Sequence, residues 1–468
     1  MDQHDVTIDV LQDDVLLEVF DSYRKLVIQI DGMWNWQLLL HVCRRWRYLV
    51  LESPRRLDLQ IKCSRSTPTR KLLDIWPPFP ISIACNPWSV DRNNRNIIAA
   101  LQRRDRISQI DLSCTTMLEM EEFASAMGGS FPVLTCLRVD VFRVQTSPTP
   151  DTEKLPDSFL GGSAPRLQSF VLEGAAFPAL PNLVLSASHF HELHLHRIPH
   201  AGYIPPETMV TFLLPLHNLE GLRLGFIPPE SRLLQTSPPP STRSLLPSLT
   251  RFGFDGANEY LVDFIARIDT PMLNIFQMTL FSDVIPNISQ LHKFIDRINR
   301  PKPFTDAKVF IRPWEVQAMF ESPTNLRLDI AYTTIDAPDA PSVSMIRLFE
   351  QLLTIPSQVE QLELHDFVIE EEEWAGYHEF DGSRWLQLLN PFVSVKSLYM
   401  SEGLGPLIAF ALQEVTGERV IEMLPRLDNL FFKGAETSEA SEFVKETIES
   451  FVTMRQLSGH PVVIRRWE

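Results

Sequence analysis

The chain has 468 residues, of which 44% are hydrophobic and 22% are charged, and its formal net charge is −16. This balance is typical of a globular protein that can bury an extended core. The acidic charge argues against nucleic acid as the main partner, because phosphate binding needs a basic surface. The five cysteines form no CxxC pair, which favours reduced thiols in the cytoplasm or the nucleus.

Neither a membrane segment nor a signal peptide is expected. No run of apolar residues approaches the roughly 18 that a membrane-spanning helix needs. The opening residues, MDQHDVTIDV, lack a basic region followed by an apolar core. We therefore expect no association with a membrane.

Residues 11–52 predict a small helical module. The acidic pair Asp13 and Asp14 is suited to the start of a first helix, whose N-terminal end carries partial positive charge. Apolar residues then recur at helical spacing at Leu16, Phe20 and Tyr23, extended by Val15 and Val19, with Leu17 off this stripe. A second helix is predicted from Leu39, Cys43, Trp46 and Val50, with Leu38, Val42 and Leu49 beside them. Because both helices are apolar over more than one face, some apolar surface should remain for a partner.

The pattern L-x-x-L-x-L, with apolar substitutes, recurs along the rest of the chain. The copies are ISQIDL (107–112), LTCLRV (134–139), LQSFVL (167–172), FHELHL (190–195), LEGLRL (219–224), LTRFGF (249–254), LNIFQM (273–278), VEQLEL (359–364), VKSLYM (395–400), LDNLFF (427–432) and the looser NLRLDI (325–330). The last two apolar positions are two residues apart, so they share one face of a strand.

Helical stretches separate these predicted strands, for example at residues 91–105, 258–268 and 289–298. Strand and helix in repeated alternation predict a right-handed α/β solenoid with parallel strands over residues 57–467. The alternative is a doubly wound α/β domain with leucine-rich strands.

The sequence resembles two families in turn. The repeated units resemble irregular leucine-rich repeats. Residues 11–52, with Val42, Cys43, Trp46 and Arg47 as V-C-x-x-W-R, resemble the F-box motif. The continuation, SPRRLDLQI (53–61) and TPTRKLLDIWPPFPISI (67–83), is similar to the large fungal group of F-box proteins with divergent leucine-rich repeats. Two features depart from the motif: Leu11 is followed by Gln12 where the family has proline, and the link between the two helices is longer than usual.

The resemblance implies a partner for the module. In this family the apolar face of the F-box binds an acidic Skp-type adaptor, and through it a cullin scaffold. The residues implied in adaptor binding are Leu11, Leu16, Leu17, Phe20, Leu39, Val42, Cys43 and Trp46. Arginines 44, 45 and 47 would then rim the contact. The alternative is that these arginines form only the solvated face of a core helix.

A protein target is expected on the concave face of the solenoid, where the residues between the inward leucines point. This row has mixed charge and no basic stripe, so a protein is favoured over nucleic acid. Because aromatic residues and arginine usually anchor interfaces, the candidate target-binding residues are Arg138, His194, Arg223, Tyr399 and Phe431.

No catalytic, metal or cofactor site is predicted. The sequence HELHLHRIPH (191–200) is rich in histidine, but it is not HExxH, and a surface pair at His194 and His196 is favoured over a zinc site. The expected function is therefore that of a non-catalytic substrate receptor in an SCF-type (Skp–cullin–F-box) ubiquitin ligase, with an unknown protein target. Two alternatives are a leucine-rich-repeat interaction scaffold without ligase function, and an enzyme with its site in the gap around residues 300–325.

Overall fold

The computed structural model describes residues 8–31, 36–86, 93–141, 154–226, 243–280, 289–298, 303–312, 315–323, 326–333, 346–347, 349–350, 352, 354–366, 382–433 and 439–467. The chain forms two compact units. Unit 1 comprises residues 1–144, 156–167 and 182–188, and unit 2 comprises residues 145–155, 168–181 and 189–468. The predicted module 11–52 shares unit 1 with the first strands that follow it.

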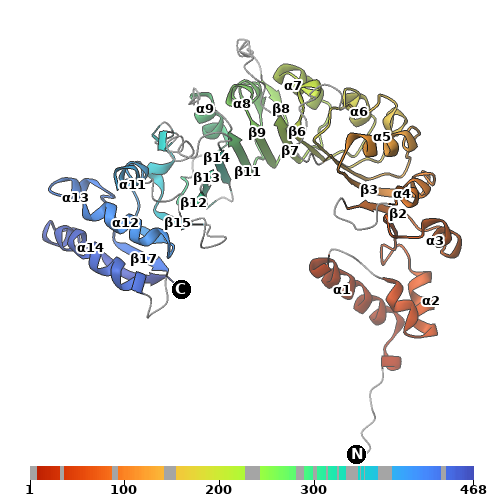
Figure 1. Cartoon of the computed structure of the whole chain (residues 1–468), viewed down its shortest axis with the longest axis horizontal. Coiled ribbons are helices and arrows are strands. Elements are labelled where there is room, and N and C mark those ends of the chain that lie inside the picture. The colour runs from red at the N-terminus through yellow and green to blue at the C-terminus, as the bar shows by residue number, and fades with distance from the viewer. Residues whose placement is uncertain are drawn as a thin grey trace, which may run out of the picture. The chain divides into compact units, whose positions relative to one another are not determined.

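Unit 1 combines the N-terminal helices with four parallel strands in the order β1-β2-β3-β4 (Figure 1). Its elements are η1 (Ile8–Val10), α1 (Asp13–Asp31), η2 (Trp36–His41), α2 (Arg44–Glu52), β1 (Ile61–Cys63), α3 (Thr69–Ile75), β2 (Ile81–Cys85), α4 (Asn94–Leu101), β3 (Ile107–Cys114), α5 (Met117–Ala126), β4 (Cys136–Val141) and η3 (Phe159–Gly162). Helix α6 (Leu180–Leu185) contains residues of both units.

Unit 2 contains a long sheet that is mostly parallel. Its elements are β5 (Ser169–Glu173), β6 (Glu192–Ile198), η4 (His200–Gly202), α7 (Pro206–Leu213), β7 (Gly221–Phe226), β8 (Ser244–Leu245), β9 (Arg251–Gly256), α8 (Asn258–Ala266), β10 (Ile268–Asp269), β11 (Ile275–Leu280), α9 (Ser289–Ile298), β12 (Asp306–Arg312), β13 (Glu315–Glu321), β14 (Arg327–Thr333), η5 (Pro356–Gln358), β15 (Gln361–Asp366), α11 (Gly382–Leu389), β16 (Ser397–Met400), α12 (Leu404–Gln413), α13 (Arg419–Glu422), β17 (Asn429–Lys433), α14 (Glu439–Leu457) and β18 (Val463–Trp467). The strand order is β5-β6-β7-β9-β11-β14-β13-β12-β15-β16-β17-β18, and β8 and β10 form a separate pair. The protein is therefore of the α/β class, as predicted.

Each copy of the L-x-x-L-x-L pattern forms a strand, as predicted. In most copies the first apolar residue of the pattern is buried two residues before the strand begins, as Leu219 is before β7 and Leu427 before β17. The backbone carbonyl of the next residue accepts hydrogen bonds from two backbone amides of the following repeat of the pattern. Examples are Gln168 with the amides of His191 and Glu192, and Lys396 with those of Asp428 and Asn429. This repeated hydrogen-bond pair holds neighbouring strands in register.

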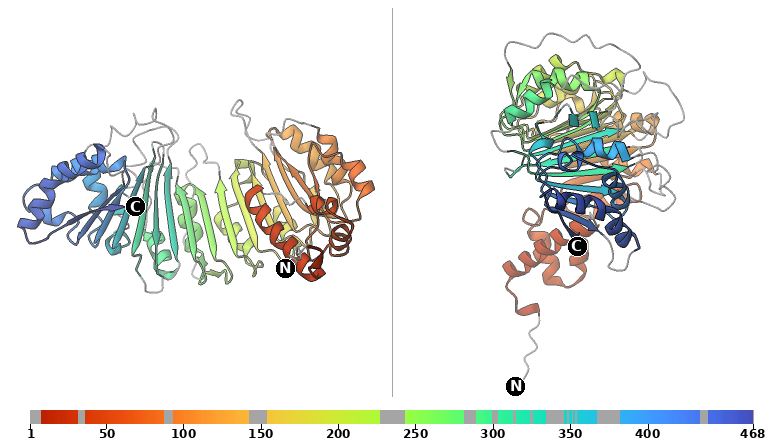
Figure 2. Two further views of the ribbon diagram at one scale, coloured as in Figure 1. Left: turned by 90° about the horizontal axis from the view of Figure 1, so that it is seen from below. Right: turned by 90° about the vertical axis from the view of Figure 1, so that its left-hand side faces the viewer.

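One face of the sheet in unit 2 is covered and the other is open. Leucines such as Leu222, Leu224, Leu362 and Leu364 are buried, and helices α7, α8, α11 and α12 lie along this side of the sheet (Figures 1 and 2). On strands such as β6 and β12, the alternating residues are half-buried. A doubly wound sheet would be buried on both faces. That alternative therefore does not describe unit 2.

The expectation of parallel strands throughout is wrong at β13. This strand runs antiparallel to both β12 and β14, and β11 pairs with β14 instead of β12. The cause is the length of the connections. Residues 313–314 and 322–326 are too few for the crossover that parallel neighbours need, so β13 pairs antiparallel with both β12 and β14. The gap in the repeat pattern around residues 300–325 contains β12 and β13, and the looser copy at residues 325–330 forms β14.

The second predicted helix of the module is also interrupted. It forms as η2 and α2, which are separated at Val42 and Cys43. Cys43 is extended, with φ of −154°, and its Sγ accepts a hydrogen bond from the backbone amide of Trp46 at 3.4 Å. A side chain that satisfies a free amide at a helix start stabilises that start. Cys43 therefore acts as the N-cap of α2, where the sequence pattern predicted an interior position.

Candidate functional site

Most of the leucine-rich face predicted for adaptor binding forms the core of the module. Leu16, Leu17, Phe20 and Leu39 are buried within unit 1. The ring of Phe20 meets that of Trp46 edge to face, with centroids 4.7 Å apart, and Trp46 is half-buried. These side chains therefore form the hydrophobic core of the module, because a module of this size has too few other apolar residues to form one.

A different set of apolar residues is exposed on the same module. Val15, Val19 and Leu26 lie on one stripe of α1, at spacings of four and seven residues. Val42, which was predicted to bind the adaptor, is 57% exposed. Leu38 and Tyr48, which lie before and after it in the sequence, are exposed as well. Leu11 and Cys43 are partly exposed. We call Val15, Val19, Leu26, Leu38, Val42 and Tyr48 the module surface.

The arginines of the module mostly hold its own parts together. Arg45 donates to Asp13, at 2.6 Å from Oδ1, and to the Leu11 carbonyl at the start of α1. Arg47 donates to the carbonyl of Leu40 at 3.0 Å. Two of the three arginines expected to rim an adaptor contact are thus engaged within the chain. Arg44 is fully on the surface.

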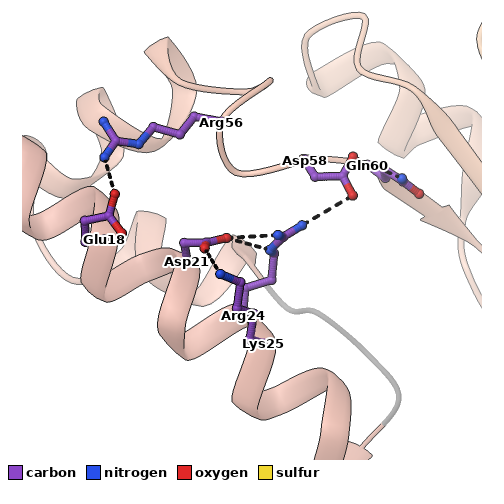
Figure 3. A network of polar contacts seen from close by, with 7 residues as sticks. All are labelled: Glu18, Asp21, Arg24, Lys25, Arg56, Asp58 and Gln60. Atoms are coloured by element: carbon purple, nitrogen blue, oxygen red, sulfur yellow. Dashed lines mark hydrogen bonds and ion pairs between the residues drawn. The ribbon is translucent and has the colours of Figure 1, made fainter. Parts of the chain in front are cut away.

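Ion pairs connect α1 to the segment that leads into β1 (Figure 3). Arg56 contacts Glu18 at 2.7 Å, and Arg24 lies between Asp21 and Asp58, at 2.9 and 3.4 Å. The hydrogen bond from Lys25 and the charge of Arg24 lower the pKa of Asp21, and Glu18 raises the pKa of Arg56. Because these groups are exposed to water, each pair contributes little to stability.

Trp36 makes the buried connection between the module and the strands of unit 1. Its indole is 2% exposed, and its Nε1 donates to the Gln60 carbonyl at 2.9 Å. Its ring packs edge to face against Trp76 and Phe79, at 5.1 and 5.6 Å between centroids. The module is therefore anchored by apolar packing to the segment between α3 and β2.

The row of residues predicted for target binding lies on the open face, which we define as the uncovered side of the sheet in unit 2. Backbone pairing places one residue of each strand side by side. The row consists of Val171, His194, Arg223, Gly253, Gln277, Asp329, Met319, Lys308, Glu363, Tyr399, Phe431 and Arg465. Four predicted residues, His194, Arg223, Tyr399 and Phe431, therefore share one face. The fifth, Arg138, is exposed in unit 1, where it pairs in register with Asp111, whose pKa is raised by burial.

The part of the open face over β5, β6, β7 and β9 carries charged side chains that are paired with one another. Arg223 binds both carboxylate oxygens of Asp255, at 2.8 and 3.3 Å. His196 lies 3.2 Å from Glu173 and 3.4 Å from Asp255, and His194 lies 3.4 Å from Glu192. In the described part of the chain, no three histidine, cysteine or acidic side chains are grouped so that they could hold a metal ion. The arrangement is a network of ion pairs on a sheet.

The part of the open face over β12 and β15–β18 is aromatic. Tyr399 and Phe431 stack with centroids 4.3 Å apart and planes 7° apart. Trp467 meets Tyr399 at 5.4 Å and His365 at 5.3 Å, and His365 stacks on Phe310 at 4.8 Å. All five rings are half-buried. We call Phe310, His365, Tyr399, Phe431 and Trp467 the aromatic ridge.

Sequence reasoning named Tyr399 and Phe431 as target-binding candidates and placed His365 on the same face, but it missed Phe310 and Trp467. Phe310 lies in β12, which carries no L-x-x-L-x-L pattern. Trp467 lies in the last strand, which follows no such pattern either. The signal that was present is the alternation of apolar and other residues in DAKVFIR (306–312), which is typical of a half-buried strand.

No helix in the described ranges combines the length and apolar character needed to cross a membrane. The sequence matches no model of a known protein family, and no curated protein matches it.

Proposed function

We propose that the protein is the substrate-receptor subunit of an SCF-type ubiquitin ligase. Residues 11–52 act as an F-box that binds a Skp-type adaptor and, through it, a cullin scaffold. The strands and helices of residues 57–467 act as an irregular leucine-rich-repeat solenoid that holds a protein target. The protein performs no chemistry itself, works in the cytoplasm or the nucleus, and raises the rate of ubiquitin transfer by keeping the target near the ligase.

The observation that carries this proposal is the exposed apolar surface of the small N-terminal module. Val15, Val19 and Val42 are each more than two-fifths exposed, as are the other residues of the module surface, while Leu16, Leu17 and Phe20 beside them are buried. Exposed apolar residues gathered on one small element are typical of a protein interface. The V-C-x-x-W-R sequence lies on this module, with Cys43 and Trp46 at the start of α2.

The repeated geometry of the sheet supports a solenoid. Successive repeats of the L-x-x-L-x-L pattern place one strand beside the next. The same pair of amide–carbonyl hydrogen bonds recurs at the start of each new strand. An architecture of this kind offers a long open face to a partner. The antiparallel insertion β12–β14 is the exception within this row.

Adaptor binding by the full-length chain tests the proposal. Purified wild-type protein should bind a purified Skp-type adaptor at micromolar concentration or tighter. Val42→Glu and Val19→Glu should each weaken binding at least about tenfold, because an unpaired charge in an apolar interface is strongly unfavourable. Biolayer interferometry gives the affinities, and circular dichroism shows whether each variant is folded.

The matched control is Leu118→Glu, which places the same charge on α5 of unit 1, where Leu118 is 77% exposed and outside the module. It should bind as the wild type does. Leu17 is unsuitable for this test because it is buried, so a charge there would unfold the module. If the wild type does not bind the adaptor, the alternative of an interaction scaffold without ligase function replaces the proposal.

A further inference from the structure

We propose that the aromatic ridge of unit 2 binds an extended, acidic protein segment that places apolar side chains against the rings. The proposal deepens the proposed function, because the segment would belong to the target. It places target recognition on β12 and β15–β18, whereas the sequence alone predicted target-binding residues along the whole face.

The rings of the ridge are already in contact with one another. Tyr399 and Phe431 each cover one face of the other through their 4.3 Å stack, and His365 and Phe310 stack in the same way, so fewer faces remain for a partner. A nucleobase or a sugar ring would need a free aromatic face on which to stack. Ring edges, in contrast, pack well against aliphatic and aromatic side chains. The geometry therefore favours a peptide with apolar anchors.

The charge next to the ridge is positive. Lys433 lies 5.8 Å from the centroid of the Trp467 ring, and Arg465 pairs in register with Phe431. Both cations are exposed, and among the described residues neither forms an ion pair with a carboxylate. Glu363, a carboxylate in the same row, is already engaged by Lys308 at 3.2 Å and His365 at 3.0 Å. An acidic segment would complement Lys433 and Arg465.

The remainder of the open face is less suited to a partner. Over β6, β7 and β9, the arginine that would serve as an anchor, Arg223, is held by two contacts to Asp255. Binding there would have to separate an existing pair before it formed a new one. At the ridge, the rings and cations can engage a partner without such a loss.

The size of the ridge fits a short segment. Five adjacent strands at about 4.8 Å spacing span about 19 Å, which an extended chain crosses in about six residues. Such a length is typical of a linear recognition motif, and hot spots of two or three anchors supply most of its affinity.

Selection from a displayed library of random peptides, roughly 12 residues long, on the full-length chain tests the proposal. We expect enriched peptides that are rich in Asp and Glu and that contain apolar anchors. For the tightest synthetic peptide, Tyr399→Ala combined with Phe431→Ala should weaken binding at least about tenfold. Lys433→Glu changes no ring of the ridge but reverses the charge beside Trp467, and it should weaken binding severalfold and reduce the effect of added salt.

The matched control is Val171→Ala, an apolar residue at the other end of the same row, which should bind the peptide as the wild type does. The proposal is overturned if no peptide is enriched, if the enriched peptides are basic or uncharged, or if the double variant binds unchanged. It is also overturned if a single-stranded DNA oligonucleotide of similar length binds more tightly and in dependence on Tyr399. Adaptor binding, measured on the same samples, reports separately on the proposed function.

Discussion

Arg455 is a charged residue with no exposure to solvent. Its guanidinium donates to carbonyls at the end of α13 and in the chain that leads to β17. The acceptors are those of Val420, Met423, Leu424, Pro425 and Leu427, at 3.1 to 3.4 Å. Leu424 lies in the left-handed region, with φ of 51°, so this connection leaves the helical path abruptly. One side chain thus satisfies several carbonyls that the turn leaves without helical partners.

Arg455→Met should destabilise the protein by about 2–4 kcal/mol, because the volume is nearly kept while the buried carbonyls lose their donor. Denaturant unfolding followed by circular dichroism gives the free energy of unfolding. The control is Arg426→Met, at an exposed position in the same connection. That variant should stay within about 0.5 kcal/mol of the wild type. If Arg455→Met lowers the free energy of unfolding no more than Arg426→Met does, water must replace the guanidinium as the donor to these carbonyls.

The cysteines differ in reactivity according to burial. None of the five forms a disulfide; Cys63, Cys85 and Cys114 are buried, and Cys43 and Cys136 are partly exposed. Burial raises the pKa of the Cys85 thiol to about 11, and it also raises the pKa of Cys63 and Cys114. A raised pKa leaves less of the reactive thiolate at a given pH.

At pH 8 in the native protein, iodoacetamide should therefore modify Cys43 and Cys136 and leave the three buried thiols largely unmodified. In denaturant, where burial is lost, all five should react. Peptide mass spectrometry measures the extent at each site. Rapid native modification of Cys85 or Cys114 would mean that β2 and β3 open readily.

Strands were predicted more successfully than helix ends or strand order. The L-x-x-L-x-L pattern located strands such as β7 and β16 because inward leucines recur every second residue. The break between η2 and α2 was missed because apolar spacing continues through Cys43, while the backbone there is extended. Strands β12 and β13 were missed because their alternating residues carry no leucine pattern. Their antiparallel order depends on the short connections.

The same distinction applies to the candidate site. Which residues share the open face follows from strand alternation, so the row containing Arg223, Tyr399 and Phe431 could be predicted. Which face of α1 is buried depends on how it packs against α2, and the sequence does not encode this in a local pattern. For that reason Leu16 and Phe20 were predicted at an interface and lie in the core, while Leu26 was missed.

Element η2 ties the module to the strands through Trp36. Trp36→Ala should remove about 3–5 kcal/mol from the stability of unit 1, because it deletes a large buried ring and leaves the Gln60 carbonyl without its donor. Hydrogen exchange should show lost protection in α1, α2 and β1 together. Tyr48→Ala, which removes an exposed ring of α2, is the control and should change stability by less than about 0.5 kcal/mol. Equal effects of the two variants would mean that the module folds independently of the strands.

At the scale of the whole molecule, the proposed function divides between two surfaces. The module surface belongs to unit 1, and the aromatic ridge belongs to unit 2. A receptor that acts by proximity needs both surfaces at once, because neither contact alone brings the target to the ligase. Variants at one surface should leave binding at the other unchanged, since residues that share no partner behave additively.

This separation can be measured with reconstituted ligase and a carrier protein fused to the selected acidic peptide. Val42→Glu should strongly reduce ubiquitin transfer to the carrier at subsaturating adaptor, while the affinity for the peptide stays at the wild-type value. Tyr399→Ala combined with Phe431→Ala should also strongly reduce transfer, but with unchanged adaptor affinity. The Leu118→Glu and Val171→Ala controls should support full transfer. Transfer that persists in the Val42→Glu protein would separate ligase activity from the module surface, because proximity requires the adaptor contact.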